Sequence, residues 1–178
     1  MGAPREPKAA KYFVALLSSD PDLLDSVEKD LAAGLSDIDA RSELVPWTAS
    51  NFYEKEMGPR LWRQFLSFAA LYSPGRLAEI KLKTQAMEER YRADTHGRRV
   101  NLDPGYLDVY KVVLASTKNA GQRIYLHSGI YGEVTLLYHN AAFHGLQYTY
   151  ADYQWPETLR FFTQLRARYL SQLRQRAE

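Results

Sequence analysis

The hydrophobic positions of the chain follow two periods, one typical of strands and one typical of helices. Residues 11–17 are apolar on both alternating faces, which indicates a central strand covered on both sides. Asp20 and Pro21 then supply a helix N-cap and a first-turn proline, and Gly34 marks the end of that helix. The positions that recur at helical spacing between them are Leu24, Val27 and Leu31.

A second strand and helix pattern follows. Residues 43–49 form a weaker strand whose Pro46 suggests an edge or a bulge, and residues 61–68 alternate more cleanly. Ser73 and Pro74 repeat the helix-start signal. The amphipathic stripe of the helix that they open is Leu77, Ile80, Thr84, Met87 and Tyr91.

From residue 98 to residue 150 the pattern changes to short strands separated by turn signals. The predicted breaks are Asp103-Pro104-Gly105, Asn119-Ala120-Gly121, Ser128-Gly129 and Asn140. Trp155 and Pro156 then open a terminal helix. Its buried stripe is predicted to be Thr158, Phe162, Leu165, Tyr169 and Leu173.

The order of these elements predicts the fold class. Strand, helix, strand, strand, helix, strand corresponds to a ferredoxin-like βαββαβ unit, and the remaining strands would extend or cover its sheet. We therefore predict an α+β fold with an antiparallel-rich sheet, extra strands and a C-terminal helix. Residues 1–10 lack periodicity and are expected to be a flexible N-terminal tail, followed by a single domain over 11–178.

Composition excludes several classes of protein. The chain has 178 residues, 46% hydrophobic content and a net charge of +2, which argues against global disorder and against a nucleic-acid partner. No apolar run approaches the roughly 20 residues that span a bilayer. The absence of cysteine excludes thiolate metal sites and disulfides and fits a cytoplasmic location. No histidine spacing indicates a metal, and no cofactor is expected.

Three sequence blocks resemble a known family. They are YEKEMG (53–58), RRVNLDPGYLDVYKVVLASTK (98–118) and RIYLHSGIYGEVTL (123–136). Together with residues 16–21 they resemble a bacterial family known only as a domain of unknown function, numbered 4416. The resemblance runs from about residue 11 into the terminal helix and implies a cytoplasmic single-domain protein without an established activity. Some members carry the label "GTP-binding protein", but this sequence has no GxxxxGK[ST] loop to hold phosphates.

Polar side chains share a face in two consecutive strands of the 123–136 block. They are Arg123, Tyr125 and His127 in one strand and Tyr131, Glu133 and Thr135 in the next. Because a hairpin keeps like faces together, we predict that Tyr125 lies opposite Glu133 and that residues 128–130 form the connecting loop.

These residues and their neighbours form a candidate cleft. Lys111 interrupts an apolar strand, Asp103 and Tyr106 belong to the predicted turn before it, and Lys118 begins the next turn. The candidate catalytic residues are Asp103, Lys111 and Glu133. The candidate ligand-binding residues are Tyr106, Lys111, Lys118, Arg123, Tyr125 and Tyr131. Lysine and arginine would hold phosphate or carboxylate, tyrosines would stack or donate, and the carboxylates would transfer protons.

Two other interpretations of the same residues remain open. Oppositely charged pairs and tyrosines are common on solvated sheets, where they stabilise without binding anything. Alternatively, the tyrosines form the surface of a non-catalytic interaction or adaptor domain, or the contact of a homodimer. The loop-like segment 53–58 is a further candidate for the ligand site. The sequence identifies no reaction and does not establish whether the protein is an enzyme.

Overall fold

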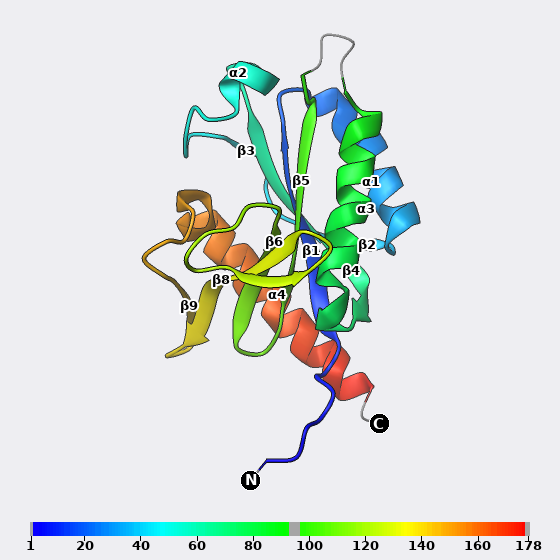
Figure 1. Cartoon of the computed structure of the whole chain (residues 1–178), viewed down its shortest axis with the longest axis vertical. Coiled ribbons are helices and arrows are strands. Elements are labelled where there is room, and N and C mark those ends of the chain that lie inside the picture. Colours follow the sequence, from blue (N-terminus) through cyan, green and yellow to red (C-terminus); the bar gives the residue numbers. More distant parts are fainter. Residues whose placement is uncertain (1, 93–96, 177–178) are drawn as a thin grey trace.

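The computed structural model describes residues 2–92 and 97–176, which form an antiparallel nine-stranded sheet with helices on both faces (Figure 1). The strands are β1 (Ala10–Ser18), β2 (Ile38–Arg41), β3 (Val45–Pro46), β4 (Trp62–Tyr72), β5 (Val100–Leu107), β6 (Lys111–Ser116), β7 (Ile124–His127), β8 (Ile130–His139) and β9 (Ala142–Gly145). The α-helices are α1 (Leu24–Gly34), α2 (Glu54–Met57), α3 (Leu77–Arg90) and α4 (Pro156–Gln175). Short 3-10 helices span Pro21–Leu23, Pro74–Arg76 and Ala151–Gln154, the last called η3. The predicted α+β class and the C-terminal helix are confirmed.

The first half of the chain has the ferredoxin-like topology that the sequence predicts. Its strands lie in the order β2-β4-β1-β5, and every neighbouring pair is antiparallel. The sheet then continues through β6 and β8 to β7, while β9 pairs with β8. The extra strands therefore extend the sheet beyond β5.

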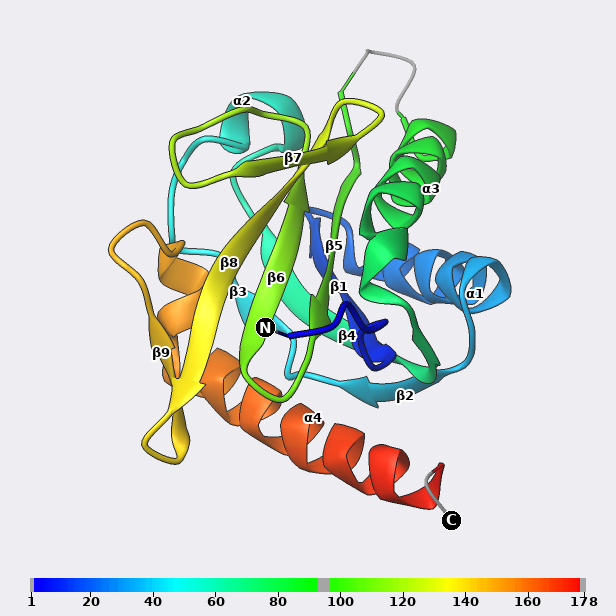
Figure 2. The ribbon, with the colours of Figure 1, turned by 60° about the horizontal axis from the view of Figure 1, so that its bottom comes forward.

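The sheet has a hydrophobic core on each face. Val14 and Leu16 of β1 pack with α1 and α3, whereas Phe13 and Ala15 pack with α4 on the other face. Figure 2 shows α4 crossing the side of the sheet opposite α1 and α3. The central position predicted for residues 11–17 is confirmed, because β1 lies between β4 and β5 and is buried along its length.

The predicted helix starts use the expected caps. The Asp20 side chain accepts a hydrogen bond from the backbone N–H of Asp22 at 3.1 Å, and the Ser73 hydroxyl accepts one from Gly75 at 3.3 Å. Each cap opens a short 3-10 turn that leads into an α-helix. At the far end of the chain, the buried hydroxyl of Tyr169 in α4 donates to the Ala9 carbonyl at 2.8 Å.

The predicted turn at residues 103–105 is wrong, because these residues lie inside β5. Proline has no backbone N–H to donate. Pro104 is tolerated because β5 pairs with β6 only from Gly105 onward, so no backbone hydrogen bond to β6 is lost at Pro104. Gly105 is required by close packing: a Cβ there would lie 2.6 Å from the Val113 carbonyl oxygen and 2.5 Å from the Phe13 ring. Pro104 and Gly105 therefore mark the point along β5 where pairing with β6 begins, not a turn.

The predicted register of the β7–β8 hairpin is also wrong. Tyr125 lies opposite Tyr131 rather than Glu133, and His127 lies opposite Ile130. The loop has two residues, Ser128 and Gly129, with φ of +54° and +76°. Positive φ at both positions is the geometry of the two-residue turn that matches strand twist. Because the loop has two residues instead of three, Ile130 is the first residue of β8, and its side chain is buried in the core.

One edge of the sheet differs from the sequence pattern. The strand predicted over residues 43–49 contracts to β3, and the unpredicted strand β2 precedes it. Both pair with β4. The apolar and polar residues of β2 do alternate, but the strand has only four residues and is half-buried, so its pattern is too short to stand out from a loop.

Candidate functional site

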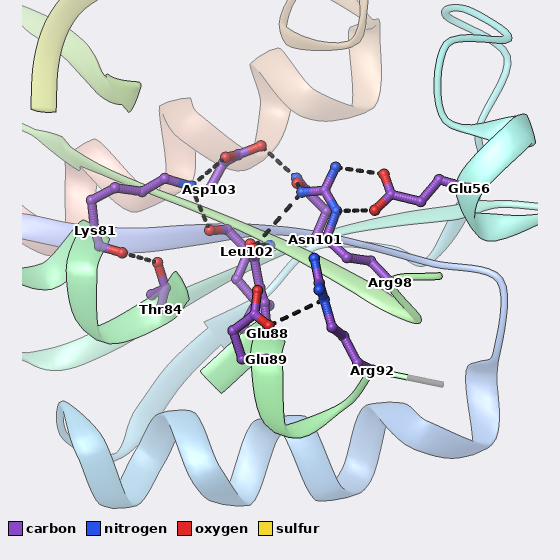
Figure 3. Close-up of polar contacts among 10 residues, drawn as sticks. All are labelled: Glu56, Lys81, Thr84, Glu88, Glu89, Arg92, Arg98, Asn101, Leu102 and Asp103. Carbon is purple, nitrogen blue, oxygen red and sulfur yellow. Dashed lines mark hydrogen bonds and ion pairs between the residues drawn. The ribbon is translucent and has the colours of Figure 1, made fainter. Parts of the chain in front are cut away.

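Strands β5 and β6 diverge and leave an opening in the sheet, which we call the fork. They pair only between Gly105–Leu107 and Val112–Leu114. On the open edge of β5, side chains of α3 replace the missing strand. The backbone N–H of Leu102 donates to Oε1 of Glu88 at 2.5 Å, and Nζ of Lys81 donates to the Leu102 carbonyl at 3.2 Å (Figure 3). Both backbone groups of Leu102 are thus satisfied without a neighbouring strand.

A continuous polar network extends from α3 along this edge. Nζ of Lys81 lies 2.8 Å from Oδ1 of Asp103, whose other oxygen accepts from Asn101 at 2.6 Å. Arg98 donates to the Asn101 side chain at 3.0 Å and makes a bidentate pair with Glu56 of α2 at 2.7 and 2.8 Å. Figure 3 shows these side chains as one chain of contacts. We call Lys81, Glu88, Arg98, Asn101 and Asp103 the α3 network.

The α3 network separates the pKa values of its two carboxyl groups. Burial raises the pKa of Glu88 to about 7, and the Lys81 charge and the Leu102 N–H offset this only in part. For Asp103, burial is outweighed by Lys81, so its pKa lies below the usual value. Burial alone would lower the pKa of Lys81, but the Asp103 and Glu88 charges raise it. Near neutral pH, Asp103 is ionised and Glu88 is partly protonated.

A second polar group lies on the α4 face of the sheet. Nε of Arg63, from β4, lies 3.1 Å from Oδ2 of Asp152 in η3. Nε of Arg123 donates to Oε2 of Glu133, from β8, at 2.8 Å, and another nitrogen of Arg123 donates to the Tyr150 hydroxyl at 2.7 Å. We call Arg63, Glu133, Asp152 and Tyr153 the η3 cluster. Each of these four residues is less than 5% exposed.

The η3 cluster contains polar atoms without a hydrogen-bond partner among the described residues. They are Nε and Nη1 of Arg63, Oε1 of Glu133, Oδ2 of Asp152 and the Tyr153 hydroxyl. The Arg63–Asp152 pair is close, but its two atoms are not aligned as a hydrogen bond. Burial raises the pKa of Asp152, against the influence of Arg63, and raises that of Tyr153 well above its usual value. Buried polar groups are nearly always paired, so this concentration points to a site that something else completes.

The α3 network and the η3 cluster line one cavity of about 430 Å³ at the fork. Aromatic side chains complete its wall: Trp47, Phe52, Tyr53, Tyr150 and Tyr153. The rings of Trp47 and Tyr53 meet edge to face at 6.1 Å, and the Arg63 guanidinium lies 4.7 Å from the centre of the Trp47 ring. A concave site with aromatic walls and convergent polar groups is the usual form of a small-molecule site.

The described residues contain neither a metal-binding cluster nor a membrane-spanning helix. Within residues 2–92 and 97–176, no group of three or more histidine, aspartate or glutamate side chains could hold a metal ion. None of the helices in those ranges combines the length and the apolar character needed to cross a bilayer.

Comparison with known families gives one match, over residues 8–169, to the family described as Domain of unknown function (DUF4416). The chain belongs to this family. The resemblance inferred from the sequence blocks is therefore confirmed, although nothing found supports the "GTP-binding" label. No curated protein and no solved structure matches the chain.

Four of the sequence-predicted candidates meet at the cavity of this DUF4416 chain. They are Asp103, Lys118, Arg123 and Glu133. Arg123 and Glu133 pair directly, as their strand faces suggested. Nζ of Lys118 lies 4.9 Å from the centre of the Phe52 ring at the cavity wall. From the segment 53–58, Tyr53 lines the cavity and Glu56 holds Arg98.

The other four candidates lie elsewhere. Lys111 lies at the closed end of the β5–β6 pair, and its ammonium group pairs with Asp108 at 2.6 Å. Tyr106 packs against Tyr12 in the core beneath α1 and α3. Tyr125 and Tyr131 contact each other on the β7–β8 hairpin, with their rings 5.4 Å apart. None of these four residues lines the cavity.

Sequence reasoning did not single out Lys81, Glu88, Arg63 or Asp152 as site residues. A signal existed for the first two, because Lys81 follows Leu77 by four residues and Glu88 follows Thr84 by four. That spacing places both on the buried face of α3. A charged side chain on a buried helix face needs a partner, and this requirement was the available clue.

Proposed function

We propose that this DUF4416 protein binds, in the fork cavity, a small organic ligand that carries a carboxylate or phosphate group. The observation that carries the proposal is an excess of cationic side chains on the wall. Arginine and lysine contribute Arg63, Lys81, Arg98, Lys118 and Arg123, against the carboxyl groups of Glu88, Asp103, Glu133 and Asp152. Because the pKa of Glu88 is raised to about 7, partial protonation of this carboxyl increases the excess near neutral pH.

Two of these cations keep N–H groups without a hydrogen-bond partner in the described ranges. Nη1 of Arg63 has no hydrogen-bond partner among the described residues. Lys118 makes no ion pair with a carboxylate in the described ranges and instead lies over the Phe52 ring. Charge-assisted hydrogen bonds from such groups to carboxylate or phosphate oxygens are among the strongest available in proteins. The aromatic wall offers contact area for the apolar part of the same ligand.

The energetics of the cavity wall favour a binding role over a purely structural one. Buried ion pairs such as Arg63–Asp152 and Arg123–Glu133 contribute little net stability, since desolvation of the charges offsets their attraction. A sheet edge could be closed more simply by apolar residues. A ligand that forms hydrogen bonds with these charged groups would explain why they surround a cavity of about 430 Å³.

Calorimetric titration tests this proposal. The probes are inorganic phosphate, succinate and 3-phenylpropionate, the last combining a carboxylate with a ring. We expect at least one probe to bind, and Lys118→Met to weaken that binding by about ten-fold to a hundred-fold. Lys111→Met is the matched control, because Lys111 pairs with Asp108 outside the cavity and should leave affinity unchanged. The proposal fails if no ligand that carries a carboxylate or phosphate group binds at millimolar concentration, or if both variants weaken binding equally.

Catalysis would require a group that exchanges a proton at neutral pH. Among the carboxyl groups of the wall, Glu88 best meets this condition, because its pKa is raised to about 7. Asp103 and Glu133, the candidates from the sequence, lie on the same wall as partners of Lys81 and Arg123. We assign them to binding and positioning in this proposal. A cytoplasmic location is part of the same proposal and is supported by the cysteine-free sequence.

A second candidate function is a protein-interaction surface, and the exposure of β7 favours it. This edge strand leaves Ile124 73% exposed, Tyr125 57% exposed and Leu126 40% exposed. Apolar edge strands are common contact surfaces, including those of homodimers. Light scattering of the wild type and of Ile124→Ser distinguishes the two functions. A dimer that the variant dissociates would favour the interaction surface, and a concentration-independent monomer would argue against self-association.

A further inference from the structure

The unpartnered atoms of the η3 cluster say more about the ligand than its negative charge. They include carboxylate oxygens, Oε1 of Glu133 and Oδ2 of Asp152, which only accept hydrogen bonds. They also include nitrogens of Arg63, which only donate, and the Tyr153 hydroxyl, which does either. A site that needs both donors and acceptors is not completed by a simple anion.

Each simple ligand leaves part of the cluster unsatisfied. A carboxylate or phosphate would take hydrogen bonds from Arg63 and Tyr153 but would bring another negative charge near Glu133 and Asp152. A simple amine would donate to those two carboxylates and leave Arg63 without a partner. A molecule that carries both groups satisfies the whole cluster.

Charge balance leads to the same ligand. Within this part of the wall the cations Arg63 and Arg123 balance the anions Glu133 and Asp152. All four are buried or nearly so, so a net charge added among them would be poorly solvated. A zwitterion adds no net charge and still supplies both kinds of hydrogen-bonding group.

We infer that the fork cavity recognises an amino acid or a closely related amino-carboxylate with an apolar side chain. Its ammonium group would donate to Glu133 and Asp152, and its carboxylate would accept from Arg63 and Tyr153. The Trp47 ring lies against the Arg63 guanidinium and meets the Tyr53 ring, so an apolar side chain next to the charged head would pack on these two rings. This inference rests on the proposed function and specifies its ligand class.

Matched probes test the inference on the full chain by calorimetry, in a buffer free of amino acids and carboxylates. One set is L-phenylalanine, 3-phenylpropionate, which lacks the amine, and phenethylamine, which lacks the carboxylate. A second set is L-leucine with 4-methylvalerate and isoamylamine. We expect at least one amino acid to bind ten-fold or more tightly than both of its truncated analogues.

Site variants give a signature that a structural role would not. Glu133→Gln should weaken amino-acid binding about ten-fold and leave 3-phenylpropionate binding equal or tighter, because a repelling charge is removed. Asp152→Asn repeats the test if loss of the Arg123 pair unfolds the first variant, which a thermal melt would reveal. Glu54→Gln, an exposed change on α2 outside the cavity, should have no effect on either ligand.

The outcomes separate this inference from the proposed function. If 3-phenylpropionate binds as tightly as phenylalanine, the amino-acid inference is overturned and anion binding stands. If only the amines bind, or if no probe binds at all, both are overturned. Tighter binding of an amino acid, with the opposite responses of the two ligands to Glu133→Gln, supports both.

Discussion

The two polar groups that line the fork cavity differ in one respect: the α3 network is satisfied internally and the η3 cluster is not. In the α3 network, Glu88 and Lys81 complete the backbone of Leu102, and Asp103 has a partner for each oxygen. In the more deeply buried η3 cluster, carboxylate, guanidinium and phenol atoms have no hydrogen-bond partner within the described part of the chain. The comparison distinguishes polar groups that hold the fold together from polar groups that we propose to be completed by a ligand.

The strongest test of this contrast is the removal of Lys81. Lys81→Met removes one partner from the partly buried Asp103 carboxylate and the partner of the buried Leu102 carbonyl. We expect the free energy of unfolding to fall by about 3–5 kcal/mol, as measured by urea denaturation. The control is Lys83→Met on the same helix, whose exposed pair with Glu79 should contribute about 0.5 kcal/mol or less. Equal losses in the two variants would contradict a structural role for the α3 network.

The next largest effect concerns the pH dependence of stability. The pKa of Glu88 is about 7 in the folded chain, above its ordinary value of 4.5, so the folded state binds this proton more tightly. Protonated Glu88 therefore contributes on the order of 3 kcal/mol to the free energy of unfolding. This contribution is fully present below pH 4.5 and is lost as the pH rises through 7. Asp103, with its lowered pKa, acts in the opposite direction and at lower pH.

Glu88→Gln should flatten this part of the stability profile. The glutamine oxygen can still accept from the Leu102 N–H, but it does not titrate. Urea denaturation between pH 4.5 and 8 measures the slope in both proteins. An unchanged slope in the variant would show that the pH dependence arises from another group.

The smallest effect compares two buried tyrosines. The Tyr169 hydroxyl donates to the Ala9 carbonyl, whereas the Tyr153 hydroxyl has no partner among the described residues. Tyr169→Phe should therefore cost about 1 kcal/mol, and Tyr153→Phe should leave stability unchanged or slightly higher. Thermal melts of the two variants make the comparison. A clear loss of stability in Tyr153→Phe would show that its hydroxyl already has a structural partner.

Much of the fold could be predicted from the sequence because its signals are local. The apolar run of β1, the Asp20 and Ser73 caps and the stripe of α4 each lie within a few residues and agree with the structure. The errors arose where the decisive contact is distant in sequence. Pro104 and Gly105 resemble a turn unless β6 is known to leave β5 at that point, and β2 is visible as a strand only through its pairing with β4.

The site was harder to predict for the same reason. Arg123 and Glu133 belong to one hairpin, so the alternation of side chains along its two strands was enough to predict that they lie on the same face. Arg63 and Asp152 lie far apart in the sequence, and no local pattern joins them. Lys111 looked unusual in its strand, but Asp108, three residues earlier, supplies a sufficient partner.

The fork also has a mechanical consequence. The ferredoxin-like half and the strands from β6 onward are joined within the sheet only where Gly105–Leu107 pairs with Val112–Leu114, so bending stiffness is lowest along that line. Helix α4 crosses it on one face: Arg166 donates to the Val109 carbonyl in the turn between β5 and β6, and Gln172 donates to the Ala69 carbonyl of β4. Because α4 packs on strands from both parts of the sheet, we expect it to resist bending along this line and to limit how far the cavity can widen.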